Sequence, residues 1–253
     1  MPSKPYGMIC ALAKACEIVE PRWTLLILNE IWSGYTRFSD IRRAVGNISP
    51  GILSKRLCEL EKAGLVERIE DRAKGTVDYI RTQMAVDLEP AMDALAIWAQ
   101  RHIDAEVALS NGDLGGMMWF FGKSVRTSHF PPRRVVIRLH FADEIGPYPT
   151  WWLLAEPGVS PEVCVEIPDV DVDLYVETTK ISWNAIYFGR STVAREIDAG
   201  RLFAAGDALL QRTMDKWLPR SVYADAEGIR MLPAASSLPG HRGKTDGHPK
   251  VSC

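Results

Sequence analysis

The chain has 253 residues, of which 47% are hydrophobic and 25% charged, and its formal net charge at pH 7 is −2. Such values are ordinary for folded domains, and the length allows two separate cores. A nearly neutral chain has no overall field that attracts nucleic acid, so a cationic binding surface would have to be local. No apolar run approaches the ~20 residues of a membrane span, so we expect a cytoplasmic protein with no membrane partner.

Residues 9–19 form the first expected helix, with apolar side chains at helical spacing on one face and Pro21 after its end. Residues 25–32 are apolar on nearly every side. A helix of this kind is buried, so we expect it at the centre of the first domain.

Residues 36–81 contain two short helical patterns, separated by a polar turn at 46–49, and two alternating runs that follow them. The second helix has a clear start, because Ser49 can accept a hydrogen bond from an unpaired backbone N–H and Pro50 suits the first helical position. Its leucines recur at helical spacing and define a buried face, and Gly64 favours its end.

The opposite face of this second helix carries small and basic side chains, Gly51, Ser54, Lys55 and Arg56, near its first turns. In a recognition helix this end enters the major groove, where serine permits close approach and a cation meets phosphates or guanine edges. The alternative is an ordinary helical pair with a solvated basic face. The charged loop 71–75 between the two alternating runs favours the first interpretation, because such a hairpin can serve as a cationic wing.

Several segments of this region resemble the HxlR-type winged-helix transcriptional regulators of bacteria. The matching segments are RWTLLIL at 22–28, RFSDI at 37–41, IS at 48–49, LSKRL at 53–57 and LEKAGLVER at 60–68, with Cys10 upstream. The resemblance implies a mainly α winged-helix domain over residues 1–109 that binds double-stranded DNA. The residues expected to contact DNA are Arg37, Ser39, Arg42, Ser49, Gly51, Ser54, Lys55, Arg56, Arg72 and Lys74.

In regulators of this type the N-terminal helix joins a C-terminal one at a dimer interface, and a stripe of apolar residues from 87 onward offers such a partner. The same stripe could instead pack inside one protomer. A symmetric homodimer places two recognition helices about 34 Å apart, one turn of DNA, and so predicts a palindromic operator. The expected interface residues are Leu12, Leu88, Met92, Leu95 and Trp98.

Cys10 stands where some regulators of this type carry a redox-sensing cysteine, although on the apolar side of a helix a cysteine is usually an inert small hydrophobic group. The five cysteines have no close paired spacing and no neighbouring histidines, so neither a disulfide framework nor a metal site is expected. No nucleophile, phosphate-loop or dinucleotide pattern is recognisable, and Asp171 and Asp173 are expected on the wet face of a strand. We therefore expect no enzymatic activity and no cofactor.

Turn-forming residues at 110–116 mark an expected domain boundary, after which residues 110–232 form a second domain. Hydrophobic alternation predicts four strands in a meander, and helical patterns follow them. This order indicates an α+β architecture. The expected strands are 135–141, 150–155, 162–167 and 171–177, the helices are 181–188, 191–199 and 207–218, and 201–204 is a candidate edge strand.

The second domain is similar to the sterol carrier protein fold in the order of a few segments: DVDLYV at 171–176, GRL at 200–202, GDALL at 206–210 and MDKWL at 214–218. The similarity implies a hydrophobic tunnel between sheet and helices that holds a small apolar ligand. The dense aromatic side chains of this domain would line such a pocket, or would simply fill its core. The candidate pocket residues are Trp119, Phe120, Leu139, Phe141, Trp152, Trp183, Tyr187 and Phe188.

The tail, residues 233–253, has few large apolar groups and is expected to be disordered. The function we expect is a DNA-binding transcriptional regulator that binds a palindromic operator as a homodimer, modulated by a hydrophobic ligand in its sterol-carrier-like domain. Two alternatives remain open. The protein is a carrier of lipids or hydrophobic metabolites that uses the winged module to dimerise, or it is a redox-sensing regulator that acts through Cys10.

Overall fold

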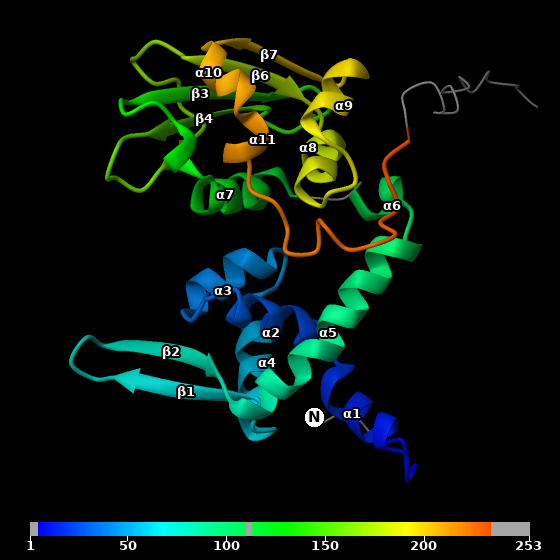
Figure 1. Ribbon diagram of the computed structural model, residues 1–253. Coiled ribbons are helices and arrows are strands. Elements are labelled where there is room, and N and C mark those ends of the chain that lie inside the picture. Colours follow the sequence, from blue (N-terminus) through cyan, green and yellow to red (C-terminus); the bar gives the residue numbers. More distant parts are fainter. Residues whose placement is uncertain (1–4, 110–112, 234–253) are drawn as a thin grey trace, which may run out of the picture.

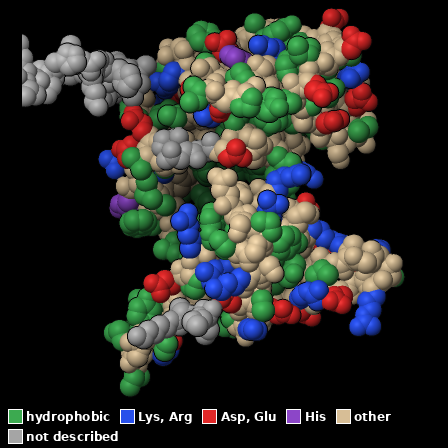
Figure 2. All heavy atoms as spheres, turned by 180° about the vertical axis from the view of Figure 1, so that it is seen from behind, with side chains coloured by type: hydrophobic (Ala, Val, Ile, Leu, Met, Phe, Trp, Pro, Cys, Tyr) green, Lys and Arg blue, Asp and Glu red, His purple; other side chains and the backbone are tan. Residues whose placement is uncertain are grey.

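The computed structural model describes residues 5–109 and 113–233 and arranges them as two domains joined by one long helix (Figure 1). Residues 110–112, part of the expected boundary, and 234–253, nearly all of the expected tail, lie outside the described residues. Seen from behind, a notch separates the projecting hairpin of the first domain from the second domain above it (Figure 2).

The N-terminal domain is a set of helices followed by a two-stranded hairpin, and the expectation of a winged-helix fold is confirmed. Its core is formed by the inward faces of α2, α3 and α4, including Ile27, Ile41 and Leu57. The elements are α1 (Ala11–Val19), α2 (Thr24–Trp32), α3 (Phe38–Val45), α4 (Pro50–Lys62), β1 (Val66–Asp71), β2 (Thr76–Arg81) and α5 (Gln83–His102).

The helix α4 begins and ends where local chemistry predicts. The hydroxyl of Ser49 accepts a hydrogen bond from the Ile52 N–H, and Pro50 occupies the first turn, where its missing N–H costs nothing. After the helix, Gly64 adopts a left-handed backbone with φ of 75° and turns the chain into β1. The backbone is strained before α2, because its N-cap residue, Trp23, has φ of 82°, a conformation that costs energy for a bulky residue.

The C-terminal domain has a five-stranded mixed sheet in the order β5-β4-β3-β6-β7, and the expectation of an α+β domain is confirmed. The expected meander is wrong beyond β5, because β6 returns to pair in parallel with β3. The elements are α6 (Ala105–Leu109), α7 (Leu114–Ser124), a 3-10 turn (Thr127–His129), β3 (Val135–Phe141), β4 (Thr150–Ala155), β5 (Glu162–Cys164), β6 (Leu174–Thr178), α8 (Lys180–Tyr187), α9 (Val193–Asp198), β7 (Leu202–Gly206), α10 (Ala208–Arg212) and α11 (Met214–Trp217).

The glycines at 115–116 were expected to interrupt the helical pattern, but they lie inside the first turn of α7. The reason is local, because Asp113 caps this helix by accepting a hydrogen bond from the Gly116 N–H at 2.8 Å. Two other expected elements also differ, since the third strand ends at Cys164 and the last helical pattern divides at Thr213 into α10 and α11.

One face of the sheet is covered by α7, α8, α10 and α11, and the domain core lies between them. Aromatic rings fill much of it: Phe121 packs against Trp183 with ring centroids 5.1 Å apart, and Phe141 packs against the same tryptophan at 5.7 Å. Side chains of β3 and β4 alternate between the two faces of the sheet. Leu139 and its cross-strand neighbour Trp151 face the helices, whereas Arg138 and its neighbour Trp152 face the other way.

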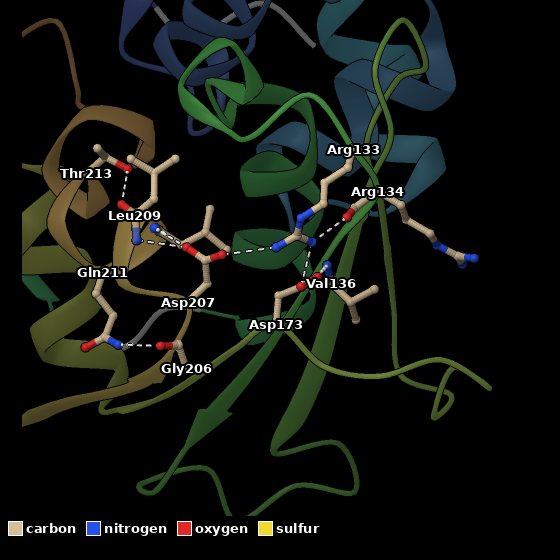
Figure 3. Close-up of polar contacts among 10 residues, drawn as sticks. Arg133, Arg134, Val136, Asp173, Gly206, Asp207, Leu209, Gln211 and Thr213 are labelled. Carbon is tan, nitrogen blue, oxygen red and sulfur yellow. Dashed lines mark hydrogen bonds and ion pairs between the residues drawn. The ribbon is translucent and has the colours of Figure 1, made fainter.

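An arginine ties three strand ends together at one edge of this domain (Figure 3). The guanidinium of Arg133 lies 2.6 Å from an Asp173 carboxylate oxygen and 3.0 Å from one of Asp207. The other Asp173 oxygen accepts the Val136 N–H, so this carboxylate is not simply solvated as expected. Asp207 also caps α10, and the backbone N–H of Leu210 is the main cause that lowers its pKa.

The C-terminal end of α5 is held by the second domain. The Arg190 side chain, only 2% exposed, donates hydrogen bonds to the carbonyl oxygens of Ala99 and Ile103 and to the side chain of Gln100. A cation suits this position because the carbonyl end of a helix is electronegative. Residues 219–232, which we call the strap, then return along the same helix end, where Arg230 N donates to the Gln100 carbonyl at 3.0 Å.

The strap crosses the second domain closely at one glycine. Gly189 has φ of 71°, and a Cβ placed there would come within 2.0 Å of the Ala224 carbonyl oxygen. Only a residue without a side chain fits beneath the strap at this point. On the neighbouring side, α6 packs against α8, with Ala105 and Leu109 buried beside Ala185.

Candidate nucleic-acid interface and interdomain cavity

Along its first turns, the outer face of α4 is not covered by other parts of the domain. Leu53 and Leu57 point into the core, whereas Ser49, Gly51 and Ser54 are exposed. The Lys55 side chain is 51% exposed, and its ammonium lies 4.0 Å from a Glu59 oxygen, at the outer limit of an ion pair. Small residues and an exposed cation on one helix face suit an approach to a nucleic-acid backbone. The exposed residues of this face are Ser49, Gly51, Ser54 and Lys55.

Arg56 is placed differently from its neighbour. Its Nε donates to the Arg22 carbonyl oxygen at 3.1 Å, and its guanidinium forms an ion pair with Glu59. The side chain is only 18% exposed. Arg56 therefore links α4 to the segment before α2 and does not join the exposed face that sequence spacing assigned to it.

The wing, residues 66–81, carries exposed cations at its tip. Arg72 and Lys74 are exposed, and the Lys74 ammonium lies 3.3 Å from a carboxylate oxygen of Asp71. The other Asp71 oxygen accepts the backbone N–H groups of Ala73 and Lys74, which shapes the turn. The tip therefore presents one exposed ammonium and one exposed guanidinium to solvent.

The remaining candidate DNA contacts lie on α3 and just before it. Arg37 forms a 2.8 Å ion pair with Asp78 of β2 and holds the start of α3 against the wing. Ser39 and Arg42 are exposed, and both border a cleft between α3 and the C-terminal domain. Figure 2 shows Lys and Arg side chains at the inner end and along the lower side of the notch above the wing.

Large apolar side chains of α1 and α5 are left uncovered in the protomer. Helix α1 has no buried residue, and Leu12 is exposed. On α5, Leu95 and Trp98 are exposed, the latter by 56%, with the His102 ring 5.6 Å from that of Trp98. The expected interface residues Leu88 and Met92 behave differently, since they pack partly against the winged-helix core.

A cavity of about 1200 Å³ lies at the junction of the two domains rather than between sheet and helices. Its walls come from α2 and α5 on one side, and from α7, α8 and the strap on the other. Five of the eight candidate pocket residues line it: Trp119, Phe120, Trp183, Tyr187 and Phe188. The other three do not, because Leu139 and Phe141 are fully buried in the core and Trp152 lies on the opposite face of the sheet.

The N-terminal side of this cavity is acidic. Glu30 projects from α2, and burial is the main cause that raises the pKa of its carboxyl group; the Asn29 amide, which donates a 3.0 Å hydrogen bond, opposes the shift. Asp93 of α5 accepts a 2.7 Å hydrogen bond from the Tyr223 hydroxyl, whose pKa is raised to about 12 by burial and by this carboxylate. Sequence patterns did not single out these three residues, because each comes from a different element and none sits in a motif.

Trp119 of α7 separates this cavity from a second cleft of about 720 Å³ with a basic border. Its ring contacts the Tyr35 ring at 5.3 Å, and the Arg43 guanidinium and the Lys123 ammonium lie 5.5 Å and 5.8 Å from its centroid. Trp119 is thus the aromatic contact through which the C-terminal domain meets α3 and the segment before it.

Cys10 is exposed at the N-terminus of α1 and makes no side-chain cap there. Among the described residues, no group of three or more His, Cys, Asp or Glu side chains is arranged to hold a metal ion. In the same part of the chain, no helix combines the length and apolarity needed to cross a bilayer.

Comparison with known proteins identifies the first domain. Residues 18–107 match a family model described as HxlR-like helix-turn-helix. An uncharacterized HTH-type transcriptional regulator of Bacillus subtilis, YvaP, is 36% identical over 92 residues, which are 36% of this chain and 85% of that protein. A similar regulator of Methanothermobacter thermautotrophicus is 30% identical over 95 residues, covering 37% of this chain and 72% of that one.

Solved structures match the same share of the chain. The reduced form of the transcriptional regulator YodB from B. subtilis is 28% identical, with a TM-score of 0.34, and covers 38% of this chain and 96% of that one. The family model ends at residue 107, so it leaves the sheet domain outside the match.

Proposed function

This chain belongs to the HxlR-like helix-turn-helix family of DNA-binding transcriptional regulators, and on that premise we propose that it binds a palindromic operator as a homodimer, under the control of a small hydrophobic ligand. The matched relatives carry the name of regulators rather than enzymes. We divide the chain into a DNA-binding and dimerisation domain (1–109), a ligand-binding domain (110–232) and a tail (233–253). The sterol-carrier-like fold of the second domain belongs to this proposal, and the helices packed on one face of its mixed sheet support it.

The observation that carries the proposal is the exposed face of α4. Four residues of this face are small or cationic, and their neighbours on the inner face are completely buried. A helix held this firmly from behind can enter a major groove without rearranging its own domain. The exposed cations of the wing tip, Arg72 and Lys74, would then meet phosphates beside the same site, and Arg37, Ser39 and Arg42 would border it.

Homodimerisation is supported by the exposed apolar residues of α1 and α5. A helix of nine residues is marginal in water by itself, and α1 buries none of its residues in the protomer. Pairing α1 with α5 of a second copy would cover Leu12, Leu95 and Trp98 together. Two-fold symmetry would then repeat α4 along the DNA and account for a palindromic site.

Control by a ligand is supported by the position of the large cavity. Its walls include Asn29 and Trp32 of the DNA-binding domain as well as Trp183 and Tyr187 of the second domain. A ligand that contacts both domains has a different affinity for each relative arrangement of them, and this difference is the physical requirement for coupling to operator binding.

The test is a selection of bound duplexes with purified full-length protein, followed by gel shifts on the selected site. We expect a palindrome, and we expect Lys55→Ala to weaken binding by about 1–3 kcal/mol if the side chain reads a base, or to lower the salt slope by about one if it meets a phosphate. Lys216→Ala, an exposed lysine on α11, is the matched control and should leave both values unchanged. Equal effects of the two substitutions would remove α4 from the interface.

A further inference from the structure

We propose that the ligand of the interdomain cavity is a lipophilic organic cation, with the Glu30 carboxylate as its counter-ion and the surrounding aromatic rings as its walls. This inference rests on the proposed ligand role of the cavity and adds the chemical class of the ligand. It is carried by the partners of the charged groups that line the cavity and by the aromatic side chains beside them.

Glu30 is a carboxylate on the cavity wall that no cation of the described residues neutralises. Its side chain accepts one hydrogen bond, from the neutral Asn29 amide, and no ion pair to it is found in the described part of the chain. An unpaired carboxylate that is partly removed from water is costly, and a cation placed beside it recovers part of that cost. The cavity therefore holds a negative group that the folded chain leaves uncompensated.

The other charged groups of the cavity are already engaged or lie toward solvent. Glu89 forms a 3.4 Å ion pair with Arg81, and Asp93 accepts the Tyr223 hydroxyl. Arg220 is paired with Asp225 at 2.9 Å. The last cation on the wall, Arg126, is exposed. No arginine of the wall is thus paired with Glu30.

Aromatic rings surround the same space. Trp32 shares α2 with Glu30, and Trp119, Phe120 and Tyr187 come from the opposite domain. Glu30 and Tyr187 line the same cavity from the two domains, and burial is the main cause that raises the pKa of the Tyr187 hydroxyl, with a smaller contribution from the Glu30 charge. Aromatic faces attract cations, most strongly where water is excluded, and such rings are used to hold quaternary ammonium groups.

The shape and polarity of the cavity favour an organic cation over a metal ion. Its volume of about 1200 Å³ exceeds that of a bare ion by far, and the apolar walls can replace only the weak hydration shell of a bulky cation. The Trp32 indole N–H is buried without a hydrogen-bond partner in the described residues. This N–H is covered by the protein, so a ligand in the cavity would meet the Trp32 ring rather than its nitrogen.

The test compares two probes of nearly equal size and shape but opposite charge, tetraphenylphosphonium and tetraphenylborate. Binding to full-length protein is measured by isothermal titration calorimetry. We expect the phosphonium to bind at least about tenfold more tightly than the borate, and Glu30→Gln to reduce this preference by about tenfold because it removes the charge and keeps the shape. Glu177→Gln, on the exposed face of β6, is the matched control and should preserve the preference.

A second variant protects the test against a misfolded Glu30→Gln protein. Asn29→Lys places an ammonium beside Glu30 within the chain, and we expect it to abolish the preference for the phosphonium by supplying the missing cation. A preference that survives both substitutions would overturn the proposal. If both probes bind with equal affinity to the wild type, the cavity is a ligand site and the charge assignment is wrong. If neither probe binds nor changes operator affinity in a gel shift, the proposed ligand role itself fails.

Discussion

Two neighbouring stretches of α5 lie in different surroundings. Toward its middle, Leu95 and Trp98 face solvent, and the α1 side chains that could cover them are exposed as well. At its C-terminal end, Gln100 is buried and the carbonyl groups of Ala99 and Ile103 are bound by Arg190 of the second domain. One helix thus has an exposed apolar face at Leu95 and Trp98, and a few residues later its Gln100 side chain and terminal carbonyl groups are bound by the second domain.

The difference shows how a single helix can connect two units. An apolar surface without polar groups of its own can accept a second protomer, since association there needs few directional bonds. A helix terminus must instead satisfy its free carbonyls, and a buried arginine with several donors does so in one fixed geometry. Any rotation of α5 caused by dimerisation would therefore be transmitted to the second domain.

The largest effect on stability is expected from removing the arginine that binds the C-terminal end of α5. Arg190→Met should lower the stability of the protein by about 3 kcal/mol, because the carbonyl oxygens of α5 and the Gln100 side chain would lose their donors while still buried. Thermal unfolding followed by circular dichroism measures this change. Arg212→Met, at an exposed position of α10, is the control. Equal melting temperatures for the two variants would mean that the arginine does not anchor the helix.

The second prediction concerns the open face. Trp98→Asp should weaken a homodimer by about 2–4 kcal/mol, since large aromatic side chains at the centre of an interface dominate its affinity. Sedimentation velocity at several concentrations would then detect a shift toward the monomer. Ile145→Asp changes a fully exposed apolar residue on the second domain and should not alter the association. A variant Trp98→Asp that remains as dimeric as the control would place the interface elsewhere.

The smallest effect is expected where the strap meets the middle of α5. Tyr223→Phe should cost about 1 kcal/mol, because it removes the hydrogen bond to the Asp93 carboxylate. The pKa of Tyr223 in the folded protein, about 12, exceeds the ordinary tyrosine value of 10.0, so its contribution to stability is complete below about pH 10 and is lost as the pH rises toward 12. Comparing the alkaline unfolding of wild type and variant isolates this loss. Identical pH profiles would contradict the assignment.

The winged-helix domain was predictable because its signals are local. The capping serine and proline, the leucine spacing and the terminal glycine of α4 all lie within 49–64, and each predicts the same helix. Strands of the second domain were predicted by alternation, but their partners were not. Whether β6 pairs with β5 or returns to β3 depends on the packing of α7 and α8 over the sheet, which no short segment encodes.

The candidate sites show the same division. Lys55 and Arg56 are neighbours with similar charge, and only the position of Arg22 and Glu59 decides that one is exposed and the other held. The aromatic residues of the cavity were recognisable as a class. Its acidic wall was not, because Glu30 reaches the cavity from a helix that the sequence indicates only as core.

The glycine beneath the strap has a consequence for the whole junction. Any larger residue at Gly189 would meet the Ala224 carbonyl and force the strap outward. Tyr223 would then move away from Asp93, and the Arg230 N–H would leave the Gln100 carbonyl. The contact between the two domains along the strap therefore depends on the absence of a side chain at Gly189, and one added carbon atom there would separate the strap from α5.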